Sequence, residues 1–202
     1  MDKMTLVQLR NITLNYGDKE IFKDLNLRIV ESEKYLIHGV NGSGKTSLLK
    51  LVAKLMTPQQ GEVLWEAKDQ PNQPRVNYVA AHAKGMFNHL TGEENLRIHF
   101  KLRKCEDSIW DNLIKNFQNY NNFNSALRTP FCECSMGMKK LLLLAASLSF
   151  PARAFILDEP FLHLDEENKE KLIQYMSLVD KTLIIATPQK INLDGFKNIC
   201  LT

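Results

Sequence analysis

The chain has 202 residues, of which 44% are hydrophobic and 24% are charged, and its formal net charge is +3. This mixture is expected of a soluble globular protein, and the length suffices for one domain with an inserted subdomain. The net charge is too small to indicate binding to nucleic acid, and it would be tolerated beside an anionic membrane surface.

No stretch of the sequence has the composition of a membrane span or a secretion signal. Apolar runs stay below the roughly 18 residues that a spanning helix needs, and the start, "MDKMTLVQLR", lacks the apolar core of a signal peptide. We therefore expect the protein to stay in a reducing compartment. Its cysteines form neither a CxxC pair nor a cluster with histidine, so idle or buried thiols are favoured over a metal or redox pair. They are Cys105, Cys132, Cys134 and Cys200.

The first third of the chain is dominated by predicted strands. Residues 5–16 and 25–30 alternate apolar and polar side chains, as half-buried antiparallel strands do. Residues 34–39, "KYLIHG", are more continuously apolar, which indicates a strand covered on both faces. Two further strands are predicted at 61–65 and 75–81.

From about residue 90 onward, helices come first and then alternate with strands. Residues 91–102 and 105–117 have helical periodicity, and the asparagine-rich stretch 118–126, "QNYNNFNSA", is predicted to be a loop. An apolar helix follows residue 140, and after it come a strand at 154–160, a charged helix at 165–179 and a strand at 181–187. Strands that alternate with helices imply right-handed parallel crossovers and hence an α/β core. We expect this core to comprise residues 1–81 and 141–202, with a helical insertion at 82–140.

The sequence "GVNGSGKT", Gly39 to Thr46, matches the P-loop pattern GxxxxGK[ST] in full. It lies between the predicted strand at 34–39 and a predicted helix at 47–56, which is the context that the pattern requires. Glycines let the backbone amides point at phosphate oxygens, and the helix start adds its positive dipole end. Lys45 would neutralise the β- and γ-phosphates of ATP, and the Thr46 hydroxyl would bind Mg²⁺. The predicted nucleotide-binding residues of this segment are Gly39, Asn41, Gly42, Ser43, Gly44, Lys45, Thr46 and Ser47.

A second acidic element follows the apolar strand in "AFILDEP". Asp158 and Glu159 stand at the carboxyl end of this strand, where α/β sheets hold their ligands. We expect Asp158 to bind Mg²⁺, directly or through water, and Glu159 to polarise the attacking water as general base.

At this point the sequence resembles the ATP-binding cassette (ABC) ATPases, whose signature, usually LSGGQ, lies between the P-loop and the acidic strand. "CSMGM" stands in that place, since Ser135 precedes Asp158 by 158 − 135 = 23 residues. The resemblance implies that Ser135 and the Gly137 amide bind the γ-phosphate held by the P-loop of a second copy. Met136 replaces a glycine of the pattern and Met138 its glutamine, so backbone contacts persist while those of the glutamine side chain do not.

The resemblance implies a fold and further site residues. The fold is a single P-loop NTPase (RecA-like) domain over residues 1–202, with an N-terminal antiparallel β subdomain and an inserted helical subdomain. Tyr16 resembles the aromatic residue that stacks on adenine, although a core tyrosine is the competing interpretation. His82 stands at the position of the Q-loop glutamine, and "LHLD", ending in Asp165, resembles the D-loop along the dimer seam.

One departure from the family pattern concerns hydrolysis. The strand "TLIIAT" is followed by Pro188, where the family has a switch histidine that contacts the γ-phosphate. Proline offers no hydrogen-bond donor, so we predict ATP binding and dimerisation with slow hydrolysis.

Several short strings resemble one subgroup, the ATP-binding subunit of the haem exporter in bacterial cytochrome c maturation; they are "GEVLW", "HAKG", "ENLRIHF", "ILDEPF" and "TPQ". This resemblance implies a homodimer, peripheral on the cytoplasmic face of the inner membrane, docked to integral membrane permease subunits and using ATP to release a haem-loaded chaperone. The sequence leaves open the ATPase of another small exporter, a non-transport ATP-gated clamp and a degenerate cassette that binds ATP without hydrolysis.

Overall fold

The computed structural model describes residues 4–66, 76–81, 85–188 and 191–201. The chain forms two compact units. The first contains residues 1–78, 152–158 and 180–202, and the second contains residues 79–151 and 159–179. The boundaries that we expected from the sequence, at 81/82 and 140/141, describe subdomains of the family pattern and stay a prediction.

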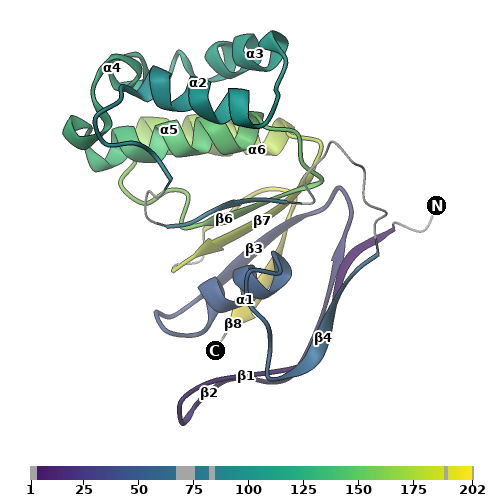
Figure 1. Cartoon of the computed structure of the whole chain (residues 1–202). Coiled ribbons are helices and arrows are strands. Elements are labelled where there is room, and N and C mark those ends of the chain that lie inside the picture. The colour runs from purple at the N-terminus through teal and green to yellow at the C-terminus, as the bar shows by residue number, and fades with distance from the viewer. Residues whose placement is uncertain (1–3, 67–75, 82–84, 189–190, 202) are drawn as a thin grey trace. The chain divides into compact units, whose positions relative to one another are not determined.

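An antiparallel sheet occupies the N-terminal part of the first unit (Figure 1). It contains β1 (Thr5–Tyr16), β2 (Lys19–Val30) and β4 (Gln60–Trp65) in the order β2-β1-β4. The aliphatic side chains of β1 are all buried, but they do not alternate strictly as predicted, because Leu6 and Val7 are consecutive and the pairing with β2 shifts register after Leu9. β2 is longer than the predicted strand at 25–30, because the hairpin turn at Gly17 (φ 58°) pairs Tyr16 directly with Lys19.

The second sheet of this unit is the parallel sheet that the sequence predicted. Its strands are β3 (Lys34–Gly39), β5 (Val76–Val79), β6 (Ala154–Asp158), β7 (Thr182–Thr187) and β8 (Phe196–Leu201), in the order β5-β6-β7-β3-β8. The pairs β6–β7, β7–β3 and β3–β8 are all parallel. Every residue of β6 and β7 is buried, as expected of strands covered on both faces.

Two features of the first unit differ from the predictions. β8 was not predicted, because it is an edge strand whose side chains are exposed or half-buried and therefore show no continuous apolar run. Helix α1 (Lys45–Val52) ends before the predicted residue 56. Lys54, just after the helix, has a left-handed φ of 54°, which a helix cannot continue through. Leu55 is 61% exposed, so this apolar residue, which had suggested a longer buried helix face, is not buried.

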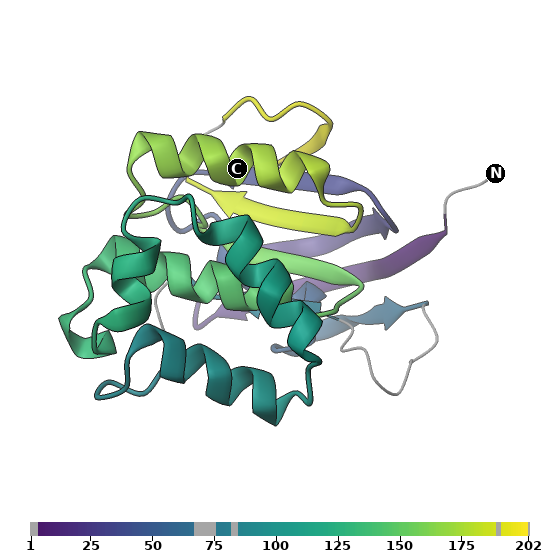
Figure 2. The same ribbon diagram turned by 90° about the horizontal axis from the view of Figure 1, so that it is seen from above.

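The second unit is helical (Figure 1, Figure 2). It contains α2 (Gly92–Leu102), α3 (Asp107–Phe117), α4 (Phe123–Arg128), a 3₁₀ turn (Phe131–Glu133), α5 (Met136–Ser149) and α6 (Glu166–Leu178). Helix α5 packs against α2, α3 and α4. Helix α2 begins with a capping box, in which Thr91 and Glu94 satisfy each other's backbone amides.

Helix α4 corrects the prediction of a loop over residues 118–126. The helix begins at Phe123, after Asn122 in a left-handed conformation (φ 62°). Phe123, Ala126 and Leu127 are buried, so tertiary packing provides the stability that the asparagine-rich sequence lacks on its own. The first part of the stretch, residues 118–122, does lie outside helices and strands.

The described part of the chain offers no helix that is both long and apolar enough to cross a membrane. All four cysteines are free thiols; Cys134 is buried, whereas Cys132 and Cys200 are exposed.

Candidate functional site

The loop Gly39–Thr46 connects β3 to α1 at the carboxyl edge of the parallel sheet (Figure 1). Gly44 is the N-cap of α1 and has a left-handed φ of 95°. A Cβ at Gly44 would lie only 2.6 Å from Cγ2 of Ile21, so both the conformation and the packing require glycine. The loop therefore presents the positive end of α1 at the edge of the sheet where α/β proteins hold ligands.

Lys45 is only 6% exposed, and its ammonium group lies inside the loop. Nζ donates hydrogen bonds to the carbonyl oxygens of Gly39 (2.7 Å) and Val40 (2.9 Å). These contacts use two of the three donors of the ammonium group. A buried positive charge is thus held within the turn, where it suits an anionic ligand.

The Ser43 hydroxyl is a buried polar group without a protein partner. Its Oγ is inaccessible to solvent and has no hydrogen-bond partner among the described residues. Such groups are rare, because an unsatisfied buried hydroxyl costs about 1–3 kcal/mol. A phosphate oxygen in the loop would satisfy it, so this observation fits a bound polyphosphate.

Thr46 and Asp158 lie 112 residues apart in the sequence and meet in the fold. Thr46 Oγ1 donates a 2.8 Å hydrogen bond to Oδ2 of Asp158, which is 3% exposed at the end of β6. A hydroxyl and a carboxylate side by side are the hard oxygen donors that Mg²⁺ takes in combination with substrate phosphates. No cluster of three or more His, Cys, Asp or Glu side chains that could hold a metal occurs in the described ranges.

Tyr78 is a third member of this group that sequence reasoning missed. Its hydroxyl lies 3.5 Å from Oδ2 of Asp158, at the end of β5. Burial, followed by the negative charge of Asp158, raises the pKa of Tyr78 to about 12, so the phenol keeps its proton and donates to the carboxylate. Its place in the sequence could have indicated this role, because Tyr78 lies near the end of β5, the neighbour of β6, and so reaches the same edge of the sheet as Asp158.

The side chains of Ser47 and Tyr16 also meet. Tyr16 Oη lies 3.2 Å from Ser47 Oγ and 3.6 Å from the sulfur of Met56. Tyr16 is 52% exposed, so it is not a core residue, and the competing interpretation from the sequence is excluded. An exposed ring anchored by its hydroxyl is available for stacking.

Ser135 and Gly137 lie in the second unit, at the start of α5. Ser135 is the N-cap of this helix, and its Oγ accepts a 3.2 Å hydrogen bond from the Met138 amide. Both residues line a cavity of about 330 Å³. Its other lining residues include His163, Asp165, Asn121 and Asn122, so the structure brings the predicted signature and D-loop segments into one hollow.

The remaining predicted residues are placed as follows. Glu159 directly follows Asp158, is half-buried and has an unusual left-handed φ of 47°. Asn41 and Gly42 are exposed in the P-loop. Pro188 is exposed immediately after β7. His82 lies outside the described residues.

Lys140 is a further buried charge that the sequence did not reveal. It is 3% exposed, and its Nζ donates a 3.1 Å hydrogen bond to the carbonyl oxygen of Ala81. The residue therefore links α5 to the segment that follows β5.

Comparison with known proteins identifies the class that this fold and site define. The sequence model of the ABC transporter family matches residues 22–162. The cytochrome c biogenesis ATP-binding export protein CcmA of Histophilus somni is 31% identical over 210 residues, which cover 95% of this chain and 94% of that protein. The spermidine/putrescine import ATP-binding protein PotA of Spiroplasma citri is 29% identical over 83% of this chain, which spans 49% of its length. A solved putative ABC transporter ATP-binding protein from Pyrococcus furiosus has a TM-score of 0.76 at 20% identity and covers 95% of this chain.

The chain therefore belongs to the ABC transporter family. Within that family it is an ATP-binding subunit, and its P-loop NTPase fold is that of the solved ABC proteins. The predictions of family and fold class are confirmed.

Proposed function

We propose that this subunit binds Mg²⁺–ATP at the P-loop and hydrolyses it at a site completed by Ser135 and Gly137 of a second copy. The amides of Gly39–Thr46 cradle the phosphates, and Ser43 and Lys45 supply a hydroxyl and a positive charge. The observation that carries this proposal is the 2.8 Å contact between the Thr46 hydroxyl and the Asp158 carboxylate. It supports a magnesium position between the two elements that the sequence predicted to share the ion.

In the proposed hydrolysis, each residue has one task. Thr46 and Asp158 would hold Mg²⁺, which would supply positive charge to the phosphate groups. Glu159 accepts a proton from the water whose oxygen attacks the γ-phosphorus, while the bond to the bridging oxygen breaks and ADP leaves. Ser135 and Gly137 of the second copy donate hydrogen bonds to the γ-phosphate oxygens. Pro188 cannot donate to the phosphate, so turnover is slow.

The proposal is tested by measuring ATP affinity and ATP turnover of the purified wild type, Lys45→Ala and Glu159→Gln proteins. Lys45→Ala should raise the dissociation constant for ATP at least tenfold, because it removes a buried charge from the phosphate site. Glu159→Gln should keep ATP binding within about twofold and abolish turnover, since the amide cannot accept the proton at neutral pH. Wild-type affinity in Lys45→Ala, or undiminished turnover in Glu159→Gln, would count against the assignment of these roles.

We further propose that the subunit serves haem export in cytochrome c biogenesis. The CcmA protein of Histophilus somni is similar over nearly the full length of both chains, whereas PotA of Spiroplasma citri extends well beyond the matched part. In this proposal the subunit forms a homodimer, lies peripherally on the cytoplasmic face of the inner membrane, docks to permease subunits and drives release of a haem-loaded chaperone. Purification of the tagged subunit from membranes tests this: co-purified haem-handling membrane proteins support it, and a polyamine or lipid permease in their place would overturn it.

A further inference from the structure

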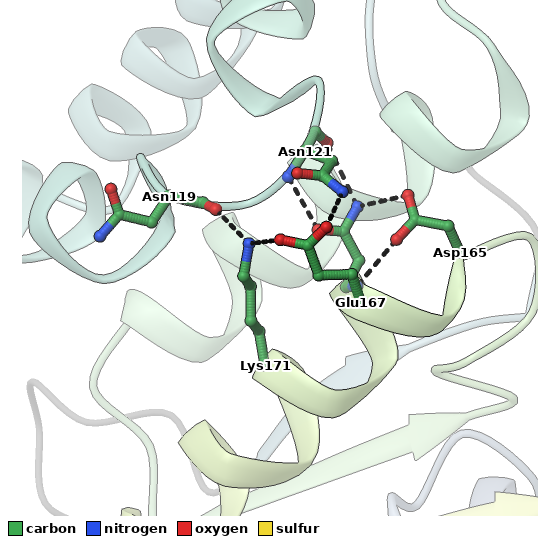
Figure 3. A network of polar contacts seen from close by, with 6 residues as sticks. Asn119, Asn121, Asp165, Glu167 and Lys171 are labelled. Carbon is green, nitrogen blue, oxygen red and sulfur yellow. Dashed lines mark hydrogen bonds and ion pairs between the residues drawn. The ribbon is translucent and has the colours of Figure 1, made fainter.

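The asparagine-rich segment between α3 and α4 has no role in the function proposed so far. In the structure, residues 119–122 are tied to the first turns of α6 by a network of polar contacts (Figure 3). Asn119 and Asn121 come from the loop, whereas Asp165, Glu167 and Lys171 belong to α6 and its N-cap. All of them lie in the second unit.

Asn168 forms the buried centre of this network. It is 2% exposed. Its side-chain oxygen accepts a 2.8 Å hydrogen bond from the Asn121 backbone amide, and its Nδ2 donates to the Asn121 carbonyl oxygen at 3.2 Å. One side chain thus satisfies both backbone groups of Asn121, as a neighbouring strand would.

The same amide group also fixes the start of α6. Asn168 Nδ2 donates to Oδ2 of Asp165 at 3.1 Å, and the Asn168 backbone amide donates to Oδ1 at 2.8 Å. Both carboxylate oxygens of Asp165 are therefore engaged with Asn168. Asn168 fastens two chain segments, residues 119–122 and the N-cap of α6, to each other.

The outer contacts of the network are more exposed. Lys171 Nζ donates to the Asn119 carbonyl oxygen and to Oε1 of Glu167, each at 2.6 Å, and Asn121 Nδ2 donates to Oε2 of Glu167 at 2.8 Å. The Lys171 and Glu167 side chains are 30% and 60% exposed. Exposed ion pairs contribute little, so the constraint on the loop comes mainly from Asn168.

Both segments that Asn168 joins are walls of the cavity beside Ser135. Asn121 and Asn122 line it together with residues 163–165, and Asn168 itself is a lining residue. The tip of α5, residues 135–138, also lines the cavity, and a Cβ on Gly137 would lie 2.7 Å from the His163 carbonyl oxygen. The tip is therefore in close contact with the segment whose end Asn168 holds.

We propose that Asn168 is a positioning residue for the nucleotide contact between two copies, holding the loop 119–122 and Asp165 in the arrangement that keeps Ser135 and Gly137 in place. The inference rests on the proposed function, because it assigns the cavity to the γ-phosphate bound by the second copy. Removal of the Asn168 side-chain amide leaves the backbone groups of Asn121 without their partner and removes the hydrogen bond to Oδ2 of Asp165, while Oδ1 keeps its bond to the Asn168 backbone amide. The P-loop lies in the first unit and keeps its own contacts.

Asn95 provides a matched control. It is a fully buried asparagine of the second unit that clasps a loop in the same way. Its Oδ1 accepts from the Phe87 amide at 2.6 Å, and its Nδ2 donates to the carbonyl oxygens of Phe87 and Leu90. It does not line the cavity. Asn95→Ala therefore also removes buried side-chain hydrogen bonds to a loop, but it leaves the proposed site unaltered.

The experiment uses the Glu159→Gln chain as parent, since it should accumulate the ATP-bound dimer. Asn168→Ala, the size-conserving Asn168→Asp and Asn95→Ala are compared by sedimentation with saturating Mg²⁺–ATP, by ATP affinity of the monomer and by amide exchange. Both Asn168 variants should weaken dimerisation about tenfold or more, keep the monomer's ATP affinity within about twofold and speed exchange at residues 135–138. Asn95→Ala should lower the melting temperature and leave dimerisation unchanged.

The outcomes separate the inference from the function on which it rests. If both Asn168 variants dimerise like the parent, or if Asn95→Ala weakens dimerisation equally, Asn168 is only a structural residue and the inference is wrong. If the parent itself stays monomeric with ATP, the shared site fails. Amide exchange then decides the positioning role by itself. Exchange at residues 135–138 that is unchanged in the Asn168 variants would overturn that role, whereas faster exchange would show that Asn168 still positions the tip of α5.

Discussion

Gly137→Ala tests whether the tip of α5 is held against the segment His163–Asp165. An added Cβ would lie 2.7 Å from the His163 carbonyl oxygen, whereas ordinary contacts begin at 3.4 Å, so the two must separate by 3.4 − 2.7 = 0.7 Å. The obstacle is backbone rather than a flexible side chain. His163 has a left-handed φ of 68°, and the next residue, Leu164, is only 7% exposed, so the segment has little room to move.

Two effects of this substitution oppose each other. Alanine favours a helix over glycine by up to about 1 kcal/mol. Overpacking against a rigid neighbour costs about 1–3 kcal/mol. With about 2 kcal/mol as the middle of that range, overpacking wins, and we expect a net loss of about 1 kcal/mol in the free energy of unfolding. The displaced tip should also weaken ATP-driven dimerisation of a Glu159→Gln background about tenfold, because small misplacements of binding groups are costly.

Urea unfolding and sedimentation measure the two consequences of Gly137→Ala. Met136→Ala is the control, since Met136 is the neighbouring helix residue and is 47% exposed. Its unfolding free energy should stay within about 0.5 kcal/mol of wild type. A Gly137→Ala protein that is as stable as wild type, or more stable, would refute the close approach from which the prediction is derived.

Three further predictions concern the magnesium position, the helical unit and the switch position. Tyr78→Phe should weaken ATP binding several-fold with Mg²⁺ and leave it unchanged in EDTA, since the lost hydroxyl orients Asp158; equal weakening in both buffers would contradict this. Hydrogen bonds from the Thr91 amide and then from its hydroxyl lower the pKa of Glu94 below its ordinary 4.5. The stability that the Glu94 carboxylate adds is therefore complete above pH 4.5 and is lost as the pH falls through the folded-state pKa. The urea midpoint of Glu94→Gln should fall less steeply below about pH 4.5 than that of wild type, and parallel curves would exclude the effect. Pro188→His should raise the turnover of the dimer about tenfold or more by supplying a donor to the phosphate, and an unchanged rate would show that proline is not the cause of slow hydrolysis.

The features predicted correctly from the sequence are those that local patterns determine. The motif Gly39–Thr46 specifies a strand, a turn and a helix start within a few residues, and the structure has all three. The apolar runs of β6 and β7 indicated strands buried on both faces, and they are buried throughout.

The features that sequence reasoning missed depend on contacts between distant residues. The edge strand β8 is recognisable only from its pairing with β3, and α4 is stabilised by burial against α5 rather than by propensity. The role of Tyr78 depends on its contact with Asp158, 80 residues away, and that of Asn168 on its contact with Asn121, 47 residues away. No pattern along the chain links either pair.

The most direct measurement of the central claim uses an ATP analogue with a photoreactive group on its γ-phosphate. A wild-type copy is mixed with a tagged Lys45→Ala copy, which has an intact Ser135 tip but an impaired P-loop. After illumination in the presence of Mg²⁺, we expect label on residues 135–138 of the tagged copy, because its tip would face the γ-phosphate held by the wild-type P-loop. Label confined to the wild-type chain, in a sample shown to contain mixed dimers, would contradict a nucleotide site shared between two copies.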